Sequence, residues 1–430
     1  MQGKYSAGHC NLRDEGVPIV QPTAAIDVSP RGPSLGRNRD FGLLLAGQFV
    51  SRLGDRLALV AFPWLVYSTT GSALSTGIVL ALFTLPYVLF GALAGAVIDR
   101  SRKRTLMIAA DVLRAALVAC VPFVADHSLA AVYALTFLTA CVTVFFDPCL
   151  LAFVPEVVPE EKLLRANSLL STGENLTEIA GYAAAGLIVA SFSLRGSFLL
   201  DAATFVVSAL CLLGMRARGR AAAAAAGARP LLRTLATDIR EGFRFLAGHA
   251  GLKANTILTL ICVAGVGASY PLSFLLAVQT FGGTRSFGFM EAAIGAGYLA
   301  GSLTLVVVAR RVRKGLVMTI GLIVMGSGYA VVGLLGSLPA VLVLFAALGA
   351  ANAVLLIAVD TYLQQVIPAP LRGRVLGLRF TLTQGTYALG VLSAGALATV
   401  VGVGTLFAAF GAIVLAAGVG GLLTRTVRDV

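Results

Sequence analysis

Long apolar stretches recur along nearly the whole chain, and they constrain its fold more than any other feature. Each is close to the ~20 residues that an α-helix needs to cross the hydrocarbon core of a bilayer. The chain is 58% apolar and only 12% charged, with a mean hydropathy of +0.90. Soluble domains carry about 25% charged residues. The chain is therefore predicted to be an integral membrane protein.

The stretches predict an all-α polytopic protein with twelve transmembrane helices in two groups of six. The first group covers residues 41–68, 74–98, 105–125, 129–152, 172–192 and 195–214. The second covers residues 255–280, 287–309, 316–336, 339–364, 375–399 and 403–423. Residues 1–40 are polar and lack the pattern of a cleaved signal peptide. We expect them to form a disordered cytoplasmic tail.

Lys and Arg residues are distributed very unevenly between the loops. If the amino terminus is cytoplasmic, 28 of the 33 lie on the cytoplasmic side, including three from Arg372 to Arg379. Only Arg195 and Arg285 lie on the opposite side, and three lie within spans: Arg52, Arg56 and Arg114. This asymmetry is typical of proteins that obey the positive-inside rule. It predicts a multi-pass protein of the cytoplasmic membrane with both termini inside, and it explains the net charge of +13 without a nucleic-acid partner.

The polar linker at residues 215–254 divides the chain into halves at 41–214 and 255–425. Apolar residues recur in it every three or four positions: Leu232, Leu235, Ile239, Phe243 and Leu246. This spacing predicts an amphipathic helix on the inner leaflet; a solvated linker helix is the alternative. Arg100 after the second span matches Arg310 after the eighth at an offset of 210 residues, and Arg165 matches Arg374 at 209. Repeated halves are typical of secondary transporters.

Several classes of function are excluded by the composition. The six cysteines form no CxxC pair, and the three histidines lie far apart. The chain contains no GxxxxGK[ST] run. We therefore expect no metal, no cofactor, no ATP binding and no enzymatic activity.

The stretch from Gly91 to Arg104 has the sequence GALAGAVIDRSRKR, and DVLRA follows at residues 111–115. It resembles the loop signature between the second and third spans of the major facilitator superfamily, in the drug-exporter branch that includes macrolide efflux proteins and the enterobactin exporter. The resemblance covers residues 41–425 and implies two pseudo-symmetric six-helix bundles. It also implies a gating loop formed by Gly91, Gly95, Asp99, Arg100, Arg102, Lys103, Arg104, Asp111 and Arg114.

Asp99 has a physical reason to act in such a gate. One carboxylate among the neighbouring cations can pair locally, or it can hold the positive amino-terminal end of a helix from the other half. The second contact would exist only while the cytoplasmic side is closed. The alternative is a basic loop that serves topology alone.

Acidic residues within the spans are candidates for proton or substrate binding. Each unpaired charge near the bilayer centre costs about 2.5 to 3.5 kcal/mol on insertion scales. Asp55 and Arg52 form an i,i+3 pair that is either structural or functional, and Glu174 and Glu178 share one helical face. Glu291 and Asp360 are the candidates in the second half. Asp147 and Asp201 lie near span ends, where we expect structural capping.

These features predict a secondary transporter that exports a hydrophobic or amphipathic small molecule, such as a macrolide-like antibiotic or a siderophore, by alternating access coupled to protons. Its expected partners are that substrate, protons and membrane lipids, and it is expected to function as a monomer. A lysophospholipid or lipid flippase and a non-transporting membrane receptor are the alternatives.

Overall fold

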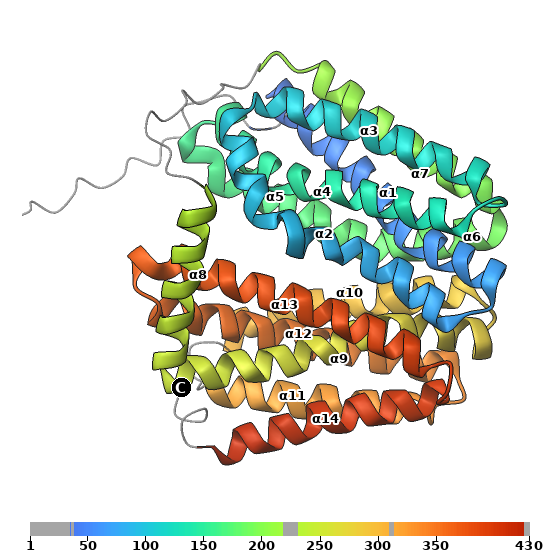
Figure 1. Ribbon diagram of the computed structural model, residues 1–430, viewed down its shortest axis with the longest axis vertical. Helices are drawn as coiled ribbons and strands as arrows, with labels where there is room; N and C mark the ends of the chain where they lie inside the picture. The colour runs from blue at the N-terminus through green and yellow to red at the C-terminus, as the bar shows by residue number, and fades with distance from the viewer. Residues whose placement is uncertain (1–34, 36–37, 218–230, 309–313, 425–430) are drawn as a thin grey trace, which may run out of the picture.

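A computed structural model describes residues 35, 38–217, 231–308 and 314–424, and every element in these ranges is helical (Figure 1). The predicted tail, residues 1–40, lies almost wholly outside the described residues. The first half contains α1 (Arg39–Thr70), α2 (Ala73–Arg100), α3 (Lys103–Val124), α4 (Leu129–Val157), η2 (Glu160–Lys162), α5 (Leu163–Leu176), the π-helical turn η3 (Thr177–Gly181), α6 (Tyr182–Ser191) and α7 (Leu194–Leu213). The linker contains α8 (Leu231–Gly248). The second half contains α9 (Ala250–Thr280), α10 (Thr284–Val308), α11 (Lys314–Val332), α12 (Leu338–Val366), α13 (Ala369–Leu397) and α14 (Val403–Leu423).

Short polar caps explain why the helices begin where they do. The side chains of Ser72, Ser128 and Ser193 accept hydrogen bonds from backbone N–H groups in the first turns of α2, α4 and α7. Such caps satisfy donors that have no partner within the helix. The predicted fifth span corresponds to the continuous segment α5–η3–α6, which begins at Leu163, earlier than the expected residue 172.

Eight helices in the described residues are long and apolar enough to cross a membrane: α2, α3, α4, α7, α9, α11, α12 and α14. The other long segments pack among them: α1, α5–η3–α6, α10 and α13. They contain charged residues, including Asp55, Glu178, Glu291 and Arg379, which make them less apolar. The chain is thus a multi-pass membrane protein.

The two halves lie side by side, with α1 to α7 in one layer and α9 to α14 in the other (Figure 1). They approach most closely at the end opposite α8. A Cβ atom on Gly77 of α2 would lie 3.0 Å from the Cα of Gly395 on α13, and one on Gly186 of α6 would lie 2.9 Å from the Cα of Gly288 on α10. Near α8, by contrast, Gly377 of α13 faces open space.

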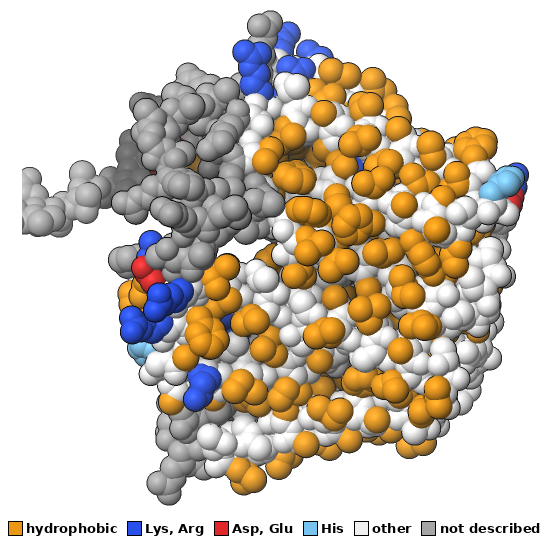
Figure 2. Space-filling model, viewed as in Figure 1, with side chains coloured by type: hydrophobic (Ala, Val, Ile, Leu, Met, Phe, Trp, Pro, Cys, Tyr) orange, Lys and Arg blue, Asp and Glu red, His pale blue; other side chains and the backbone are white. Residues whose placement is uncertain are grey.

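Helix α8 crosses the end of the second half and packs on α13, where Arg374 and Glu241 form an ion pair (Figure 1). Ile239 and Phe243 are 54% and 60% exposed, whereas Leu246 is buried. The side chains of Leu232 and Leu235 lie outside the described residues. Apolar side chains are spread over the visible face of both halves, and Lys and Arg side chains gather at the α8 end (Figure 2).

Candidate functional site

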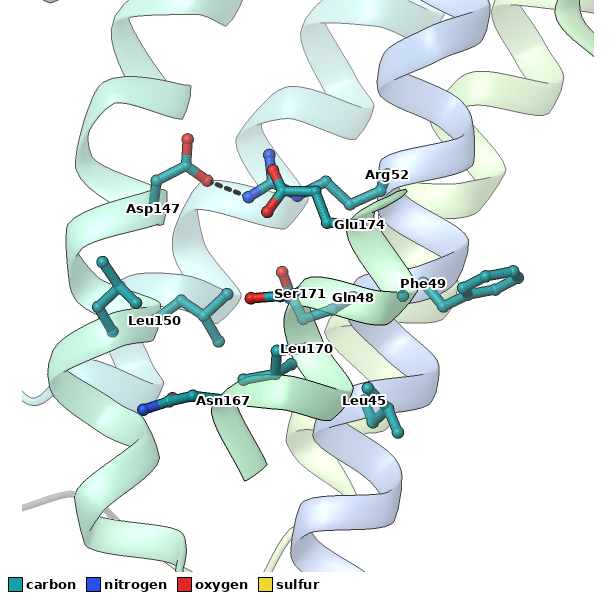
Figure 3. A pocket seen from close by; sticks show the side chains of 12 residues that line it. Leu45, Gln48, Phe49, Arg52, Asp147, Leu150, Asn167, Leu170, Ser171 and Glu174 are labelled. Carbon is teal, nitrogen blue, oxygen red and sulfur yellow. Dashed lines mark hydrogen bonds and ion pairs between the residues drawn. The ribbon is translucent and has the colours of Figure 1, made fainter. Parts of the chain in front are cut away.

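The first polar cluster surrounds Arg52, in the middle of α1 (Figure 3). Its Nη2 atom lies 2.7 Å from Oδ1 of Asp147 on α4, and the hydroxyl of Tyr87 lies 3.4 Å from Oδ2 of the same carboxylate. A cavity of about 320 Å³ opens here between α1, α4 and α5, and Glu174 lines it. Arg52 therefore presents a paired but partly exposed charge to the cavity.

The second cluster lies deeper, around Arg114 on α3, whose side chain is only 1% exposed. Arg114 forms an ion pair with Asp111 one turn earlier, and its Nη1 atom lies 3.8 Å from Oδ1 of Asp55. The guanidinium lies between the rings of Phe146 and Phe205, 4.4 and 4.3 Å from their centroids. Cation–π contacts of this kind stabilise a cation that has left water.

Asp201 on α7 is buried beside this cluster, and neither carboxylate oxygen has a hydrogen-bond partner among the described residues. The chain makes room for it through Gly54 of α1, since a Cβ atom there would lie 2.5 Å from Oδ1 of Asp201. A second cavity, of about 200 Å³, is lined by Asp55 and Asp201 together with the rings of Phe83 and Tyr87.

The third cluster lies where the two halves meet. Arg56 of α1 binds Glu178 at 2.5 Å, and its guanidinium lies 5.3 Å from the ring centroid of Tyr182. Glu178 belongs to the π-helical turn η3, which packs against α10 of the second half. On α10, Glu291 is buried and its Oε1 atom has no partner among the described residues. Two acids and one arginine thus lie at the seam between the halves.

A separate cavity of about 350 Å³ lies in the second half between α9, α12 and α13. Asp360 lines it and is largely exposed. Arg379 also lines it and is buried. The structure thus corrects two expectations. Arg379 does not belong to the cytoplasmic loop, and Asp147 and Asp201 are not helix caps, because all three lie inside helices and face interior groups or cavities.

Two cations of the predicted gating loop contact their own half. Lys103 forms a 2.5 Å ion pair with Glu156 of α4, and Arg104 donates two 2.8 Å hydrogen bonds to backbone oxygens at the end of α7. Arg102 is exposed, and Gly91 lies near Phe380 of α13. Helix α2 includes Gly95, Asp99 and Arg100, but the surroundings of Gly95 and the side chains of Asp99 and Arg100 lie outside what the structure describes.

Residues 34–428 match the family described as transmembrane secretion effectors, which covers both halves and the linker. The chain belongs to this family. Together with the fold, this confirms the predicted membership of the major facilitator superfamily and its drug-exporter branch. The chain is accordingly a membrane transporter and not an enzyme.

Two relatives belong to the same branch. The chain is 29% identical over 413 residues to the multidrug efflux pump Tap of Mycolicibacterium fortuitum, covering 93% of this chain and 97% of the pump. It is 25% identical over 309 residues to macrolide efflux protein A of Streptococcus pyogenes, covering 69% and 73% of the two chains. The first match spans both halves of this chain.

Solved structures show the same fold at low sequence identity. The nucleoside transporter NupG superposes with a TM-score of 0.73 at 12% identity, covering 90% of this chain and all of that one. A bacterial homolog of the human lysosomal transporter Spinster, in an inward-facing and unoccupied conformation, superposes with a TM-score of 0.65 at 13% identity, covering 90% and 94%.

Proposed function

We propose that the chain exports hydrophobic or amphipathic small molecules across the cytoplasmic membrane in exchange for protons. In this proposal all twelve long helical segments span the membrane, and both termini are cytoplasmic. The observation that carries it is the seam cluster, in which Glu178, Arg56 and Glu291 lie where the two halves contact each other. The efflux relatives support export of drug-like substrates.

The physical argument for protons starts from Glu291. A buried carboxylate with an unpaired oxygen is expensive as an anion, and a bound proton removes that cost. Glu178 packs against the same helix: a Cβ atom on Gly295, one turn after Glu291, would lie 3.1 Å from Cγ of Glu178, and Glu178 is paired with Arg56. If the halves rock against each other, Arg56 can leave Glu178 and pair with Glu291 instead. The acid that has lost its pair with Arg56 then takes up a proton.

The charged and titratable groups around Glu291 come from several elements. They are Arg56 of α1, Glu178 of η3, Tyr182 of α6, Tyr270 of α9, Tyr329 of α11 and Tyr387 of α13. The tyrosines stay neutral at physiological pH. Arg56 and Glu178 are therefore the partners whose charge decides whether Glu291 holds a proton.

Alternating access follows from the contacts between the halves. The close glycine contacts at the end opposite α8 keep that side shut, while the cavities lie toward α8. With the α8 end cytoplasmic, this is the conformation that receives substrate from inside. We propose that the loop from Gly91 to Arg104 closes the cytoplasmic side in the opposite conformation, with Asp99 contacting the second half.

Proton flux in liposomes tests the proposal. The purified protein would be reconstituted with a pH-sensitive dye inside, and macrolides, siderophores and lysolipids would be added under an imposed proton gradient. We expect substrate-dependent flux for one class of compound, loss of that flux in Glu291→Gln and Glu178→Gln, and reduction in Asp55→Asn. The matched control is Asp126→Asn, an exposed acid paired with Arg195 far from the seam.

Two outcomes would contradict the proposal. If flux persists at wild-type rates in both Glu291→Gln and Glu178→Gln, neither glutamate is needed for proton coupling. Movement of labelled lipid with no drug-dependent flux would favour a lipid flippase over an exporter.

A further inference from the structure

Arg379 of α13 is a buried cation with only neutral partners. Its side chain is 5% exposed. Nη1 donates to Oγ1 of Thr256 and, at 3.0 Å, to Oδ1 of Asn255, and Nη2 donates at 3.2 Å to Oγ1 of Thr259. These three residues all belong to α9. In the described part of the chain, no carboxylate lies within the 4 Å of an ion pair with this guanidinium.

Three arginines of the first half differ in this respect. Arg52, Arg56 and Arg114 each form an ion pair with at least one carboxylate. Hydroxyl and amide oxygens hold the guanidinium of Arg379 in place, but they do not neutralise its charge. Because a buried unpaired charge is costly, an ionisable residue of this kind in a membrane protein points to a functional site.

The surroundings of Arg379 fit a ligand. The cavity of about 350 Å³ that it lines is large enough for a small organic molecule. Polar groups from Asn352 and Gln384 line it alongside apolar side chains such as Leu356 and Phe380. Asp360 lines the same cavity but forms no ion pair with Arg379. The cavity therefore combines a cation that has no ion-pair partner among the described residues with an apolar wall, as an amphipathic anion requires.

We propose that Arg379 forms an anion-binding subsite in the second half, which binds a carboxylate or phosphate group of an amphipathic substrate. The planar guanidinium fork matches the geometry of either group. The hydrogen bonds from α9 fix the orientation of the fork before the ligand arrives. This inference rests on the proposed export function, and it adds the chemical class of one group that the substrate carries.

The test compares two probes of nearly the same shape, 4-phenylbutyrate and its neutral amide 4-phenylbutyramide. Their affinities would be obtained from the concentration dependence of the unfolding temperature of the purified protein. We expect wild type to prefer the carboxylate by about tenfold or more, as for a hydrogen bond to a charged group. In Arg379→Gln the preference should fall below about twofold, and Arg379→Lys should retain part of it.

Two control variants separate ligand binding from a tether between α13 and α9. Arg379→Lys keeps the cation but gives up the planar fork that bonds Asn255, Thr256 and Thr259, so part of the carboxylate preference should persist even if the protein unfolds at a lower temperature. Arg285→Gln removes an arginine of the same half that lies over the ring of Phe289, and the preference should be unchanged. An equal preference in wild type and Arg379→Gln, or no preference in wild type, would overturn the subsite.

A further arm distinguishes a transported anion from a lipid headgroup or free phosphate. Phosphatidylglycerol, phosphatidylcholine and inorganic phosphate would each compete with 4-phenylbutyrate. Competition by phosphatidylglycerol in wild type only, with no transport of 4-phenylbutyrate, would assign the site to lipid and overturn its role in substrate binding.

The subsite and the export function can fail separately. If wild type shows no carboxylate preference while Arg379→Gln still exports a macrolide, the subsite is rejected and the export function stands. A wild-type preference without transport of any compound would reject the export function and leave the subsite in place.

Discussion

The helices of the two halves contact each other in different ways. In the first half, three arginines and their acids join α1, α3, α4 and η3: Arg52 with Asp147, Arg56 with Glu178, and Arg114 with Asp111. In the second half, glycines bring helices into backbone contact. A Cβ atom on Gly297 of α10 would lie 1.8 Å from the carbonyl oxygen of Ala346 on α12. Small residues of this kind are typical of tightly packed membrane helices.

The second half shows that six helices of this fold can pack without a network of ion pairs. Buried ion pairs are weak evidence for stability, because apolar residues of similar volume often replace them without loss. We therefore propose that the charges of the first half serve transport, and we attribute the close contacts of the second half to packing.

The largest expected effect comes from breaking one ion pair of the first half. Arg114→Leu leaves Asp111, which has no exposed side-chain surface, without its cation. We expect a loss of about 3 to 5 kcal/mol in the free energy of unfolding, measured by thermal unfolding in detergent.

A double variant sharpens this prediction. Asp111→Leu combined with Arg114→Leu removes both charges, and much of the lost stability should return. If the double variant unfolds as readily as the single one, the network is required for packing and the contrast between the halves fails.

The next effect concerns the close contact in the second half. In Gly297→Ala the added methyl group meets the backbone of α12, so α10 and α12 must separate. We expect a loss of about 1 to 3 kcal/mol, typical of overpacking, seen as a lower unfolding temperature. The matched control is Gly385→Ala in α13, where a Cβ atom meets nothing within 4 Å. It should be neutral or slightly stabilising, and equal losses in both variants would argue against the packing explanation.

The smallest effect is expected at the surface. Asp126 and Arg195 form an ion pair with 60% and 69% of their side chains exposed. Asp126→Ala should change the free energy of unfolding by less than about 1 kcal/mol. A loss as large as that of Arg114→Leu would show that burial is not what separates the two pairs.

The sequence by itself determined where the helices lie and that their surroundings are lipid. The predicted span at 403–423 coincides with α14, because runs of apolar residues and their polar breaks are local features. Most of the other spans lie within about six residues of their helices, but the fifth was predicted to start at 172 and its helical segment begins at Leu163. The i,i+3 neighbours Arg52 and Asp55 could also be found, since helix geometry brings such residues together.

Only the tertiary structure decided which charges meet. Arg52 pairs with Asp147, which lies 95 residues later in the chain, and Arg379 is held by α9 instead of lying in a loop. Such pairings depend on which helices are neighbours and on how each is rotated about its axis. An apolar run is compatible with several rotations and several neighbours, so the sequence does not specify which helices meet or which faces they present. The charge network and the arginine without an ion pair are therefore defined only by the packed helices.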